Sequence, residues 1–345
     1  MVAGRQTILF DFLFCLFMVM GFSYNAFGQD PVFSQYYSAP LQTNPAFAGN
    51  TNLPRIGVHY RNQWPNLPNA YATYMVTYDQ FVPMLNSGFG ITAMGDIAGD
   101  GIYKTVSISG LYSYRVEFAE DVYAKIGIEG SYLQRSLDWN RLVFYDQLDP
   151  VYGPNDPSGN PNPTGEGQPE DLVRGNLDVS AGLLVYSRMF YAGFSMNHLT
   201  TPDESFLQIN DNLYFGLPVR LSFMGGAQFN IDNNRDGATF LSPNVLYTRQ
   251  GGFSQLNAGL YGQLGLVFAG AWYRHAGSNA DAVIGLVGVQ QGILKVGYSY
   301  DLTVSGASGF GGAHEISLIL NFDNSASAEA NRRRGRYSDC LKMFR

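Results

Sequence analysis

The chain has 345 residues, of which 46% are hydrophobic and only 14% are charged, against about 25% charged residues in ordinary soluble domains. Glycine (40), tyrosine (23) and phenylalanine (24) are abundant, and the formal net charge is -7. This mildly acidic balance argues against nucleic-acid binding, which needs a basic face, whereas low charge with many aromatic residues fits a barrel in lipid.

An export signal is predicted at residues 1–28. Arg5 supplies a basic n-region, Ile8 to Met20 form an apolar h-region interrupted by one Asp, and Ala26-Phe27-Gly28 is a small-x-small cleavage site. Cleavage there would make Gln29 the mature N-terminus. The alternative is a membrane anchor, but the apolar run is shorter than the roughly 20 residues that a spanning helix needs.

Residues 29–53 form a segment before the first predicted strand, and we expect it on the periplasmic side. It contains a D-P-V-F-S-Q-Y motif at Asp30–Tyr36 and an N-P-A-F-A-G motif at Asn44–Gly49. Its aromatic side chains are too apolar to remain free in water. The segment is therefore expected to be ordered in the periplasm or folded into the lower part of the barrel.

Residues 54–323 alternate between apolar and polar side chains. In Val122 to Tyr132, for example, Lys125 and Glu129 share the face opposite the apolar residues. Such segments start near Arg55, Tyr71, Gly88, Thr105, Val122, Leu177, Phe190, Val219, Phe240, Ser254, Gly265, Asp281, Ile293 and Ala313. They predict an all-β fold, a transmembrane antiparallel β-barrel of about 14 strands with both termini on the same side.

Short and long connections alternate between these segments, as in outer-membrane barrels. The longer surface loops are predicted at residues 62–70, 136–176, 199–216, 274–280 and 303–312. The loop at 136–176 is rich in Pro, Gly and Asn, a composition that does not form a ladder or a helix. It is either a surface contact region or disordered filler.

The polar face of the strands carries charges of both signs. The alternation along each strand places on this face Arg55, Arg61, Asp79, Arg115, Lys125, Glu129, Arg135, Asp178, Arg188, Arg220, Lys295, Asp301 and Glu315. A selective pore would favour one sign at a constriction, so a salt-bridged lumen is favoured over a selective channel. Fourteen strands could enclose either water or an internal plug.

Catalytic and metal-binding motifs are weak. His314-Glu315 lacks a second His four residues beyond the first, where Leu318 stands, and the segment alternates like a strand. Asp232–Gly237 starts like a calcium loop, but Pro243 replaces the twelfth-position Glu, so a hairpin turn is the better interpretation. No catalytic residue, metal site or cofactor is predicted, although a Ser and a His brought together by folding stay possible.

Residues 324–345 form a predicted periplasmic basic tail. It contains Arg332-Arg333-Arg334-Gly335-Arg336 and ends in Cys340 to Arg345. The tail either contacts a partner through basic and aromatic groups or is a solvated extension. Cys340 would be the only cysteine of the mature chain, either a free thiol for an intermolecular bond or a bystander.

Several motifs together resemble the PorP/SprF family, outer-membrane components associated with type IX secretion. Besides the two motifs of residues 29–53, they are Tyr60-Arg61-Asn62-Gln63-Trp64, Gly95-Asp96 with Gly99-Asp100-Gly101, Tyr298-Ser299-Tyr300-Asp301, Gly312-Ala313-His314-Glu315-Ile316 and the Cys340–Arg345 ending. The ending departs from a C-P-K-F-like pattern, because Leu341 stands where Pro is usual and Met343 precedes Phe344.

The resemblance implies a non-enzymatic protein of the cell outer membrane, with no cofactor. Its implied partners are type IX secretion components, outer-membrane lipid and large secreted surface proteins with a type-B C-terminal domain, including adhesins of gliding bacteria. Alternatives are a porin or solute transporter and, less favoured, a surface barrel enzyme. The candidate partner-binding residues are Asp30, Pro31, Phe33, Ser34, Gln35, Tyr36, Asn44, Pro45, Phe47, Arg61, Gln63, Trp64, His314, Glu315 and Phe344.

Overall fold

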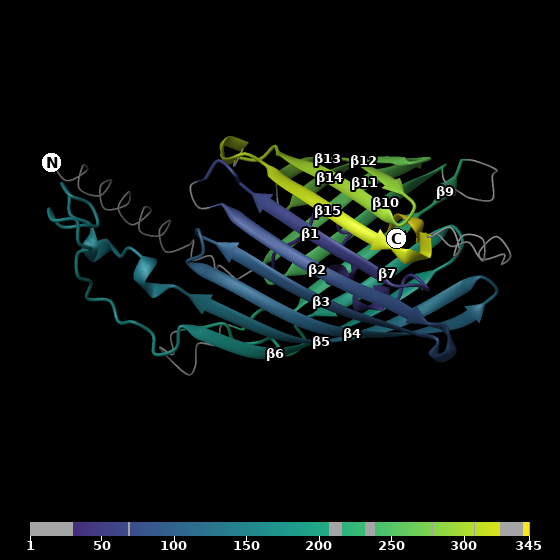
Figure 1. Ribbon diagram of the computed structural model, residues 1–345, viewed down its shortest axis with the longest axis horizontal. Helices are drawn as coiled ribbons and strands as arrows, with labels where there is room; N and C mark the ends of the chain where they lie inside the picture. Colours follow the sequence, from purple (N-terminus) through teal and green to yellow (C-terminus); the bar gives the residue numbers. More distant parts are fainter. Residues whose placement is uncertain are drawn as a thin grey trace, which may run out of the picture.

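A closed antiparallel β-barrel makes up most of the protein (Figure 1). The computed structural model describes residues 30–67, 70–206, 216–231, 239–277, 279–306, 308–324 and 341–344. The predicted export signal, the Asp232–Gly237 turn, Cys340 and the arginine run of the tail all lie outside these residues. Within them, no helix has the length and apolar character needed to cross a membrane.

The strands follow one another around the barrel in chain order. They are β1 (Arg55–Gln63), β2 (Tyr71–Val82), β3 (Ser87–Ala98), β4 (Tyr103–Ala119), β5 (Val122–Leu137), β6 (Val173–Tyr186), β7 (Phe190–Asn197), β8 (Arg220–Ala227), β9 (Phe229–Asn230), β10 (Thr239–Gln250), β11 (Phe253–Leu264), β12 (Val267–Ala276), β13 (Asn279–Gln291), β14 (Leu294–Thr303) and β15 (Ala313–Asn321).

Closure comes from the pairing of β1 with β15 and of β10 with β11, each antiparallel. Both β8 and the two-residue β9 pair with β10, one after the other along its length. The two therefore count as one crossing of the barrel. The described part of the chain therefore crosses 14 times, and the predicted strand number is confirmed. A closed barrel leaves no backbone edge exposed to lipid.

Short helices lie in the connections and near both ends of the described chain. They are α2 (Pro40–Thr43), η1 (Pro45–Phe47), η2 (Pro83–Leu85), η3 (Trp139–Arg141), η4 (Tyr145–Gln147), η5 (Ser308–Phe310), η6 (Phe322–Asn324) and η7 (Lys342–Phe344).

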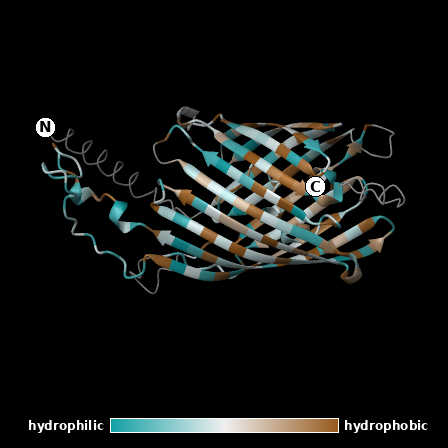
Figure 2. Ribbon diagram, in the orientation of Figure 1, coloured by the Kyte–Doolittle hydropathy of each residue, from teal (hydrophilic) through white to brown (hydrophobic). Residues whose placement is uncertain are grey.

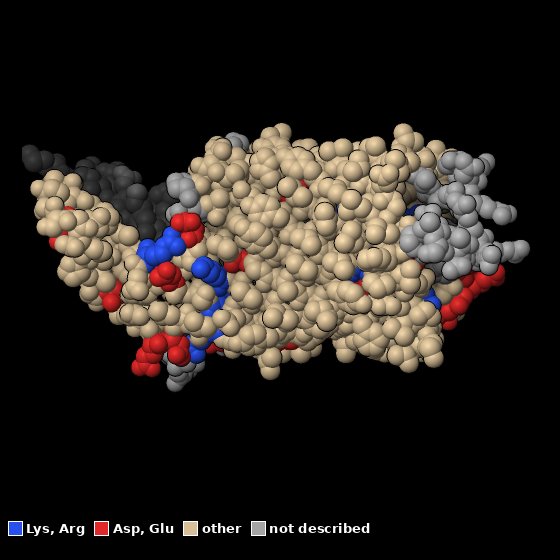
Figure 3. Space-filling view, in the orientation of Figure 1, with Lys and Arg blue, Asp and Glu red and all other residues tan. Residues whose placement is uncertain are grey.

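The strands turn their apolar side chains outward and their polar side chains inward. On β4, Val106 and Ile108 are 49% and 56% exposed, whereas Ser107 and Ser109 are 7% and 5% exposed. Figure 2 shows the resulting alternation along the strands. In Figure 3 the middle of the visible outer surface carries almost no charged side chains, and charges gather toward the two ends. This uncharged band is the surface that lipid would contact.

The two ends of the barrel differ in their connections. We call the end with the connections at 64–70, 138–172, 198–219 and 304–312 the long-loop end, and the opposite end, where β1 starts and β15 stops, the short-turn end. The longest loop projects beyond the long-loop end (Figure 1). Its two isolated bridges, Asp149 with Gly153 and Asn155 with Pro161, and two short helices, η3 and η4, give it local structure.

Two details of the sequence prediction are wrong. The expected loop at residues 274–280 is a tight turn, because β12 continues to Ala276 and β13 begins at Asn279, with Gly277 in the left-handed region at a φ of 59°. Arg188 does not face the lumen: it lies in the turn after β6 and is paired with Asp121 at 2.6 Å in a largely exposed ion pair.

Candidate functional site

The lumen of the barrel contains most of residues 30–53, which we call the plug. Asp30 lies among residues of the long-loop end, and Asn50 contacts Asp79 of β2 toward the short-turn end, so the plug runs through the barrel. Of the two placements expected for this segment, in the periplasm or within the barrel, the structure has residues 33–51 within the barrel and almost entirely buried.

The first plug motif is bound by the carboxylate of Glu315 on β15. The backbone N–H groups of Ser34 and Gln35 donate to its two oxygens at 2.6 and 2.8 Å. The side chain of Gln35 continues the contact, because its Nε2 donates to Ser299 Oγ at 3.0 Å and its Oε1 accepts from Ser317 Oγ at 2.7 Å. The motif is thus recognised through both backbone and side chain.

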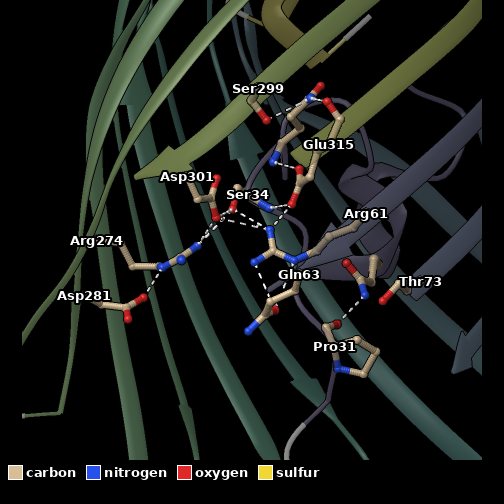
Figure 4. A network of polar contacts seen from close by, with 12 residues as sticks. Pro31, Ser34, Arg61, Gln63, Thr73, Arg274, Asp281, Ser299, Asp301 and Glu315 are labelled. Carbon is tan, nitrogen blue, oxygen red and sulfur yellow. Dashed lines mark hydrogen bonds and ion pairs between the residues drawn. The ribbon is translucent and has the colours of Figure 1, made fainter. Parts of the chain in front are cut away.

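Two arginines complete this polar network (Figure 4). Arg61 of β1 forms ion pairs with Glu315 and with Asp301 of β14, the latter at 3.2 Å. Arg274 of β12 pairs with Asp301 at 2.8 Å. Both guanidinium groups also donate to Ser34 Oγ at 2.9 Å, while that hydroxyl donates to Asp301 at 2.6 Å. Because the charges are buried, each depends on its partners for stabilisation.

Strand register explains why distant motifs meet here. Arg61 and Glu315 are direct cross-strand partners between β1 and β15, and Ser299 is the partner of Glu315 on β14. Residues at the same level and parity on adjacent strands share one face. The charged residues of three motifs, at residues 60–64, 298–301 and 312–316, therefore meet in one patch of the lumen. Ser34 to Tyr36 of the plug bind at this patch.

The second plug motif is held by shape and by backbone groups. Asn44 caps η1 by accepting from the N–H of Ala46 at 2.9 Å, and its Nδ2 donates to the carbonyls of Leu183 and Phe194 at 3.0 and 3.2 Å. A β-carbon added at Gly127 of β5 would overlap the backbone of Ala46. Strand glycines are thus required where another backbone approaches closely.

A buried lysine binds the end of this motif. Lys125 of β5 donates from Nζ to the carbonyls of Ala48 and Gly49 at 2.6 and 3.0 Å, and Ser113 Oγ donates to the Ala48 carbonyl at 2.7 Å. Gly49 has a φ of 63°, the left-handed conformation that glycine adopts without strain. The chain reverses there and leads into β1.

Leu341 to Phe344, the last described residues of the chain, pack against the plug. The ring of Phe344 lies 4.6 Å from that of Phe47 and 5.1 Å from that of Tyr191, centroid to centroid. Its carbonyl accepts from Arg55, which also pairs with Asp79 at 2.8 Å. The last described residues of the predicted tail are therefore part of the lumen packing at the short-turn end.

Aromatic stacking fixes the middle of the plug. The ring of Tyr37 stacks on Trp272 of β12, with centroids 5.2 Å apart and an interplanar angle of 11°, and lies 5.4 Å from Tyr261 of β11. Such pairs contribute roughly 0.5–1.5 kcal/mol beyond area burial.

Asp30 anchors the start of the plug at the long-loop end. It pairs with Arg220 at 3.0 Å and with Nε2 of His198 at 2.7 Å, and Nδ1 of His198 contacts Asp178 at 2.7 Å. His198 lies in the connection after β7, outside the strands. Burial lowers the pKa of His198, but the charge of Asp30 and the hydrogen bonds that the ring donates to Asp178 and Asp30 outweigh it and raise the pKa to about 9.

The candidate partner-binding residues are distributed unevenly. Those that contact the plug network or belong to the buried plug are Ser34, Gln35, Tyr36, Asn44, Pro45, Phe47, Arg61, Glu315 and Phe344, joined by Phe33 beside His59 and by Gln63, which accepts from Arg61. The Pro31 carbonyl accepts from Gln42 at 2.7 Å. Two residues lie elsewhere: Trp64 packs on Tyr71 at the long-loop end, and His314 contacts Tyr298 on the outer face.

Two network residues were not among these candidates. The alternation along its strand predicts Asp301 on the lumen face, and the residue belongs to the Tyr298–Asp301 motif. These two features of the sequence were enough to identify it as a candidate. Arg274 falls in a loop that the sequence predicts at residues 274–280, whereas β12 carries it into the lumen. Among the described residues, no group of His, Cys, Asp and Glu is arranged to hold a metal ion.

Comparison with protein families identifies a family that covers most of the chain. The family model described as type IX secretion system membrane protein PorP/SprF matches residues 25–320. No curated protein matches the chain.

Solved barrels are similar in outline. The toluene transporter TbuX of Ralstonia pickettii has 10% identity and a TM-score of 0.47, and the match covers 82% of this chain and 92% of that one. A Pseudomonas aeruginosa FadL homologue has 10% identity and a TM-score of 0.38, with 78% and 90% covered. KdgM porin has 7% identity and a TM-score of 0.34, with 78% and 99% covered.

Proposed function

This chain belongs to the PorP/SprF family of type IX secretion system membrane proteins, and we propose that it is a non-enzymatic partner that binds secreted surface proteins and helps to export or anchor them. It is an outer-membrane β-barrel of that system. Under the proposal its cargo carries a type-B C-terminal domain and includes adhesins used in gliding, and other secretion components are its further partners.

The plug within the lumen is the observation that carries the proposal. A porin needs a continuous water-filled passage. Here Ser34, Gln35 and Phe47 lie buried in the space through which solutes would pass. This favours a protein that acts through its surfaces over a solute transporter.

The longest loop is the surface that we propose for cargo contact. Tyr145 and Val151 are 91% and 79% exposed at the long-loop end, which faces outward in outer-membrane barrels. The loop is held in shape by Asp146, which accepts from the N–H of Gly165 at 2.6 Å and from the Thr164 hydroxyl at 3.0 Å. Exposed aromatic and apolar residues on an ordered support are typical of protein contact sites.

A direct role for the plug residues in partner binding stays a prediction. Because Ser34 and Gln35 are bound to Glu315 and buried, a partner would contact them only in a state in which the plug has left the lumen. The exposed loop requires no such change.

The test is recovery of partners on the barrel from native membranes. The intact chain, a Tyr145→Ser/Val151→Ser variant and a Met84→Ser control would be compared. Met84 is 95% exposed but lies in η2 at the short-turn end. We expect the intact chain and the control to recover a large secreted protein and the loop variant to recover about tenfold less, the loss typical of an interface hot spot.

Recovery of no cargo and no secretion component by the intact chain would contradict the proposal. Equal recovery by the loop variant would exclude these loop residues as the contact. Uptake of small solutes by vesicles that contain the purified barrel would favour the transporter alternative.

A further inference from the structure

A cavity of about 360 Å³ lies beside the plug. Its walls are the lumen faces of β2 to β8 together with Asp30, Pro31 and Gln42 of the plug. At about 30 Å³ per water molecule, this space corresponds to roughly a dozen waters. It also falls within the range of about 300–1,000 Å³ usual for small-molecule sites.

Carboxylates outnumber cations around the cavity. Its lining includes five carboxylates, Asp30, Asp96, Glu129, Asp178 and Glu204, and three basic side chains, Arg135, His198 and Arg220. Three of the carboxylates are paired: Asp30 with Arg220 and His198, Asp178 with His198, and Glu204 with Arg135.

The remaining two carboxylates have no ion pair in the part of the chain that the structure describes. Asp96 on β3 accepts a hydrogen bond from Thr73 Oγ1 at 2.6 Å, and Glu129 on β5 accepts one from Ser109 and has no basic neighbour in ion-pair contact. Such groups favour a ligand that brings positive charge.

A buried acceptor without a donor points to the same chemistry. Asn197 on β7 is 4% exposed and lines the cavity, and its Oδ1 has no hydrogen-bond partner among the described residues. Oε1 of Glu204 also lacks a partner, so the unsatisfied acceptors of the lining outnumber its one unsatisfied donor among the described residues, Nε of Arg220. An unsatisfied buried acceptor costs roughly 1–3 kcal/mol, so a donor-rich ligand would be stabilised here.

One part of the wall is apolar. Met75, Met94 and Leu133 line the cavity from β2, β3 and β5. Methionine side chains adapt to an aliphatic chain of varied shape. The cavity therefore combines acceptors for a charged head with an apolar surface for a short chain.

We propose that this cavity binds a small cation with an ammonium or guanidinium group on a short aliphatic chain. An ammonium has three donors and no acceptor, which matches the excess of acceptors. The cation belongs either to a free amine or to the Lys or Arg side chain of a peptide, since both present the same head and chain.

The test uses the full chain, purified in detergent micelles, and isothermal titration. The probes are cadaverine and agmatine as free cations, the tripeptide Gly-Lys-Gly as a peptide cation, pentane-1,5-diol as a neutral control of similar length, and glutarate as an anionic control. We expect at least one cation to bind at one site per chain and about tenfold more tightly than the diol, as a charged hydrogen bond implies.

The pattern of binding assigns the source. Binding of cadaverine or agmatine supports a free amine, and binding of Gly-Lys-Gly alone supports a peptide side chain. No binding by any cation at millimolar concentration, or binding of the diol or glutarate as tight as that of the cations, would overturn the proposal.

Matched variants locate the site. Glu129→Gln keeps the side-chain shape and removes the charge, so we expect about tenfold weaker cation binding. Glu117→Gln, on β4 outside the cavity lining, should bind as the intact chain does. Asp96→Asn is a second variant should Glu129→Gln fail to fold, with folding judged by heat-modifiable electrophoretic mobility. Unchanged affinity in a folded Glu129→Gln or Asp96→Asn protein would refute this site.

Discussion

The two motifs of the plug are held in the same lumen by different forces. Ser34 and Gln35 are bound by ionised side chains, with Glu315 accepting both backbone N–H groups. The backbone of Asn44 to Gly49 instead packs against strand glycines such as Gly127. The carbonyls of Ala48 and Gly49 accept hydrogen bonds from Lys125. The first contact depends mainly on charge, and the second depends mainly on shape.

This difference indicates how the plug could be released. A charge network can be weakened by a competing ionic group or by one substitution, because each buried ion relies on its partners. A backbone packed against glycine loses contact only if the barrel wall or the whole segment moves. The first motif is therefore the half more open to regulation, and the second is the half that keeps the plug in place.

The largest effect is expected from Gly127→Leu, which tests the shape-held half. The new side chain would meet the backbone of Ala46, and overpacking against backbone should destabilise the plugged state by more than about 3 kcal/mol. We expect residues 30–53 to become sensitive to protease in the purified barrel. Gly130→Leu is the matched control, since a β-carbon there meets nothing within 4 Å. Equal protease resistance of both variants would contradict shape-based retention.

Glu315→Ala tests the charge-held half. It removes the acceptor of two plug N–H groups and leaves Arg61 with fewer partners, a loss of about 3–5 kcal/mol for a broken buried pair. Amide hydrogen exchange at Ser34 and Gln35 should accelerate strongly, while exchange at Ala46 should change little. Equal acceleration at both motifs would show that the two halves are one cooperative unit.

A smaller effect is expected from Lys125→Met, which keeps the length of the side chain. Loss of charged hydrogen bonds to the Ala48 and Gly49 carbonyls should cost about 1.5–3 kcal/mol. A lower midpoint of heat-induced unfolding on gels would record this loss. A midpoint as low as that of Gly127→Leu would mean that charge, not shape, dominates the second motif as well.

The last comparison concerns pH at the start of the plug. Because the folded pKa of His198 is raised to about 9 from an ordinary value near 6.5, its pairing with Asp30 stabilises the protein fully below about pH 6.5. That contribution should disappear as the pH rises through 9. His198→Gln should lack this part of the pH dependence. If the stabilisation by His198 were instead lost as the pH falls, the predicted direction of the pH dependence would be wrong.

The sequence predicted the barrel well, because period-2 alternation in lipid-facing strands is a local signal. It also placed Arg61, Asp301 and Glu315 on the lumen face by parity. It did not show that these charges bind the chain's own N-terminal segment, because that depends on contacts more than 200 residues apart in sequence, such as Ser34 with Glu315. Arg274 was missed because strand ends are set by turn geometry, here by Gly277.

The most direct test of a plugged barrel is the ionic conductance of the intact chain in planar lipid bilayers, with Gly127→Leu measured beside it. We expect no steady conductance for the intact chain and open-channel steps for Gly127→Leu, whose plug cannot pack against β5. Steady, open-pore conductance by the intact chain would contradict the claim that residues 30–53 close the lumen.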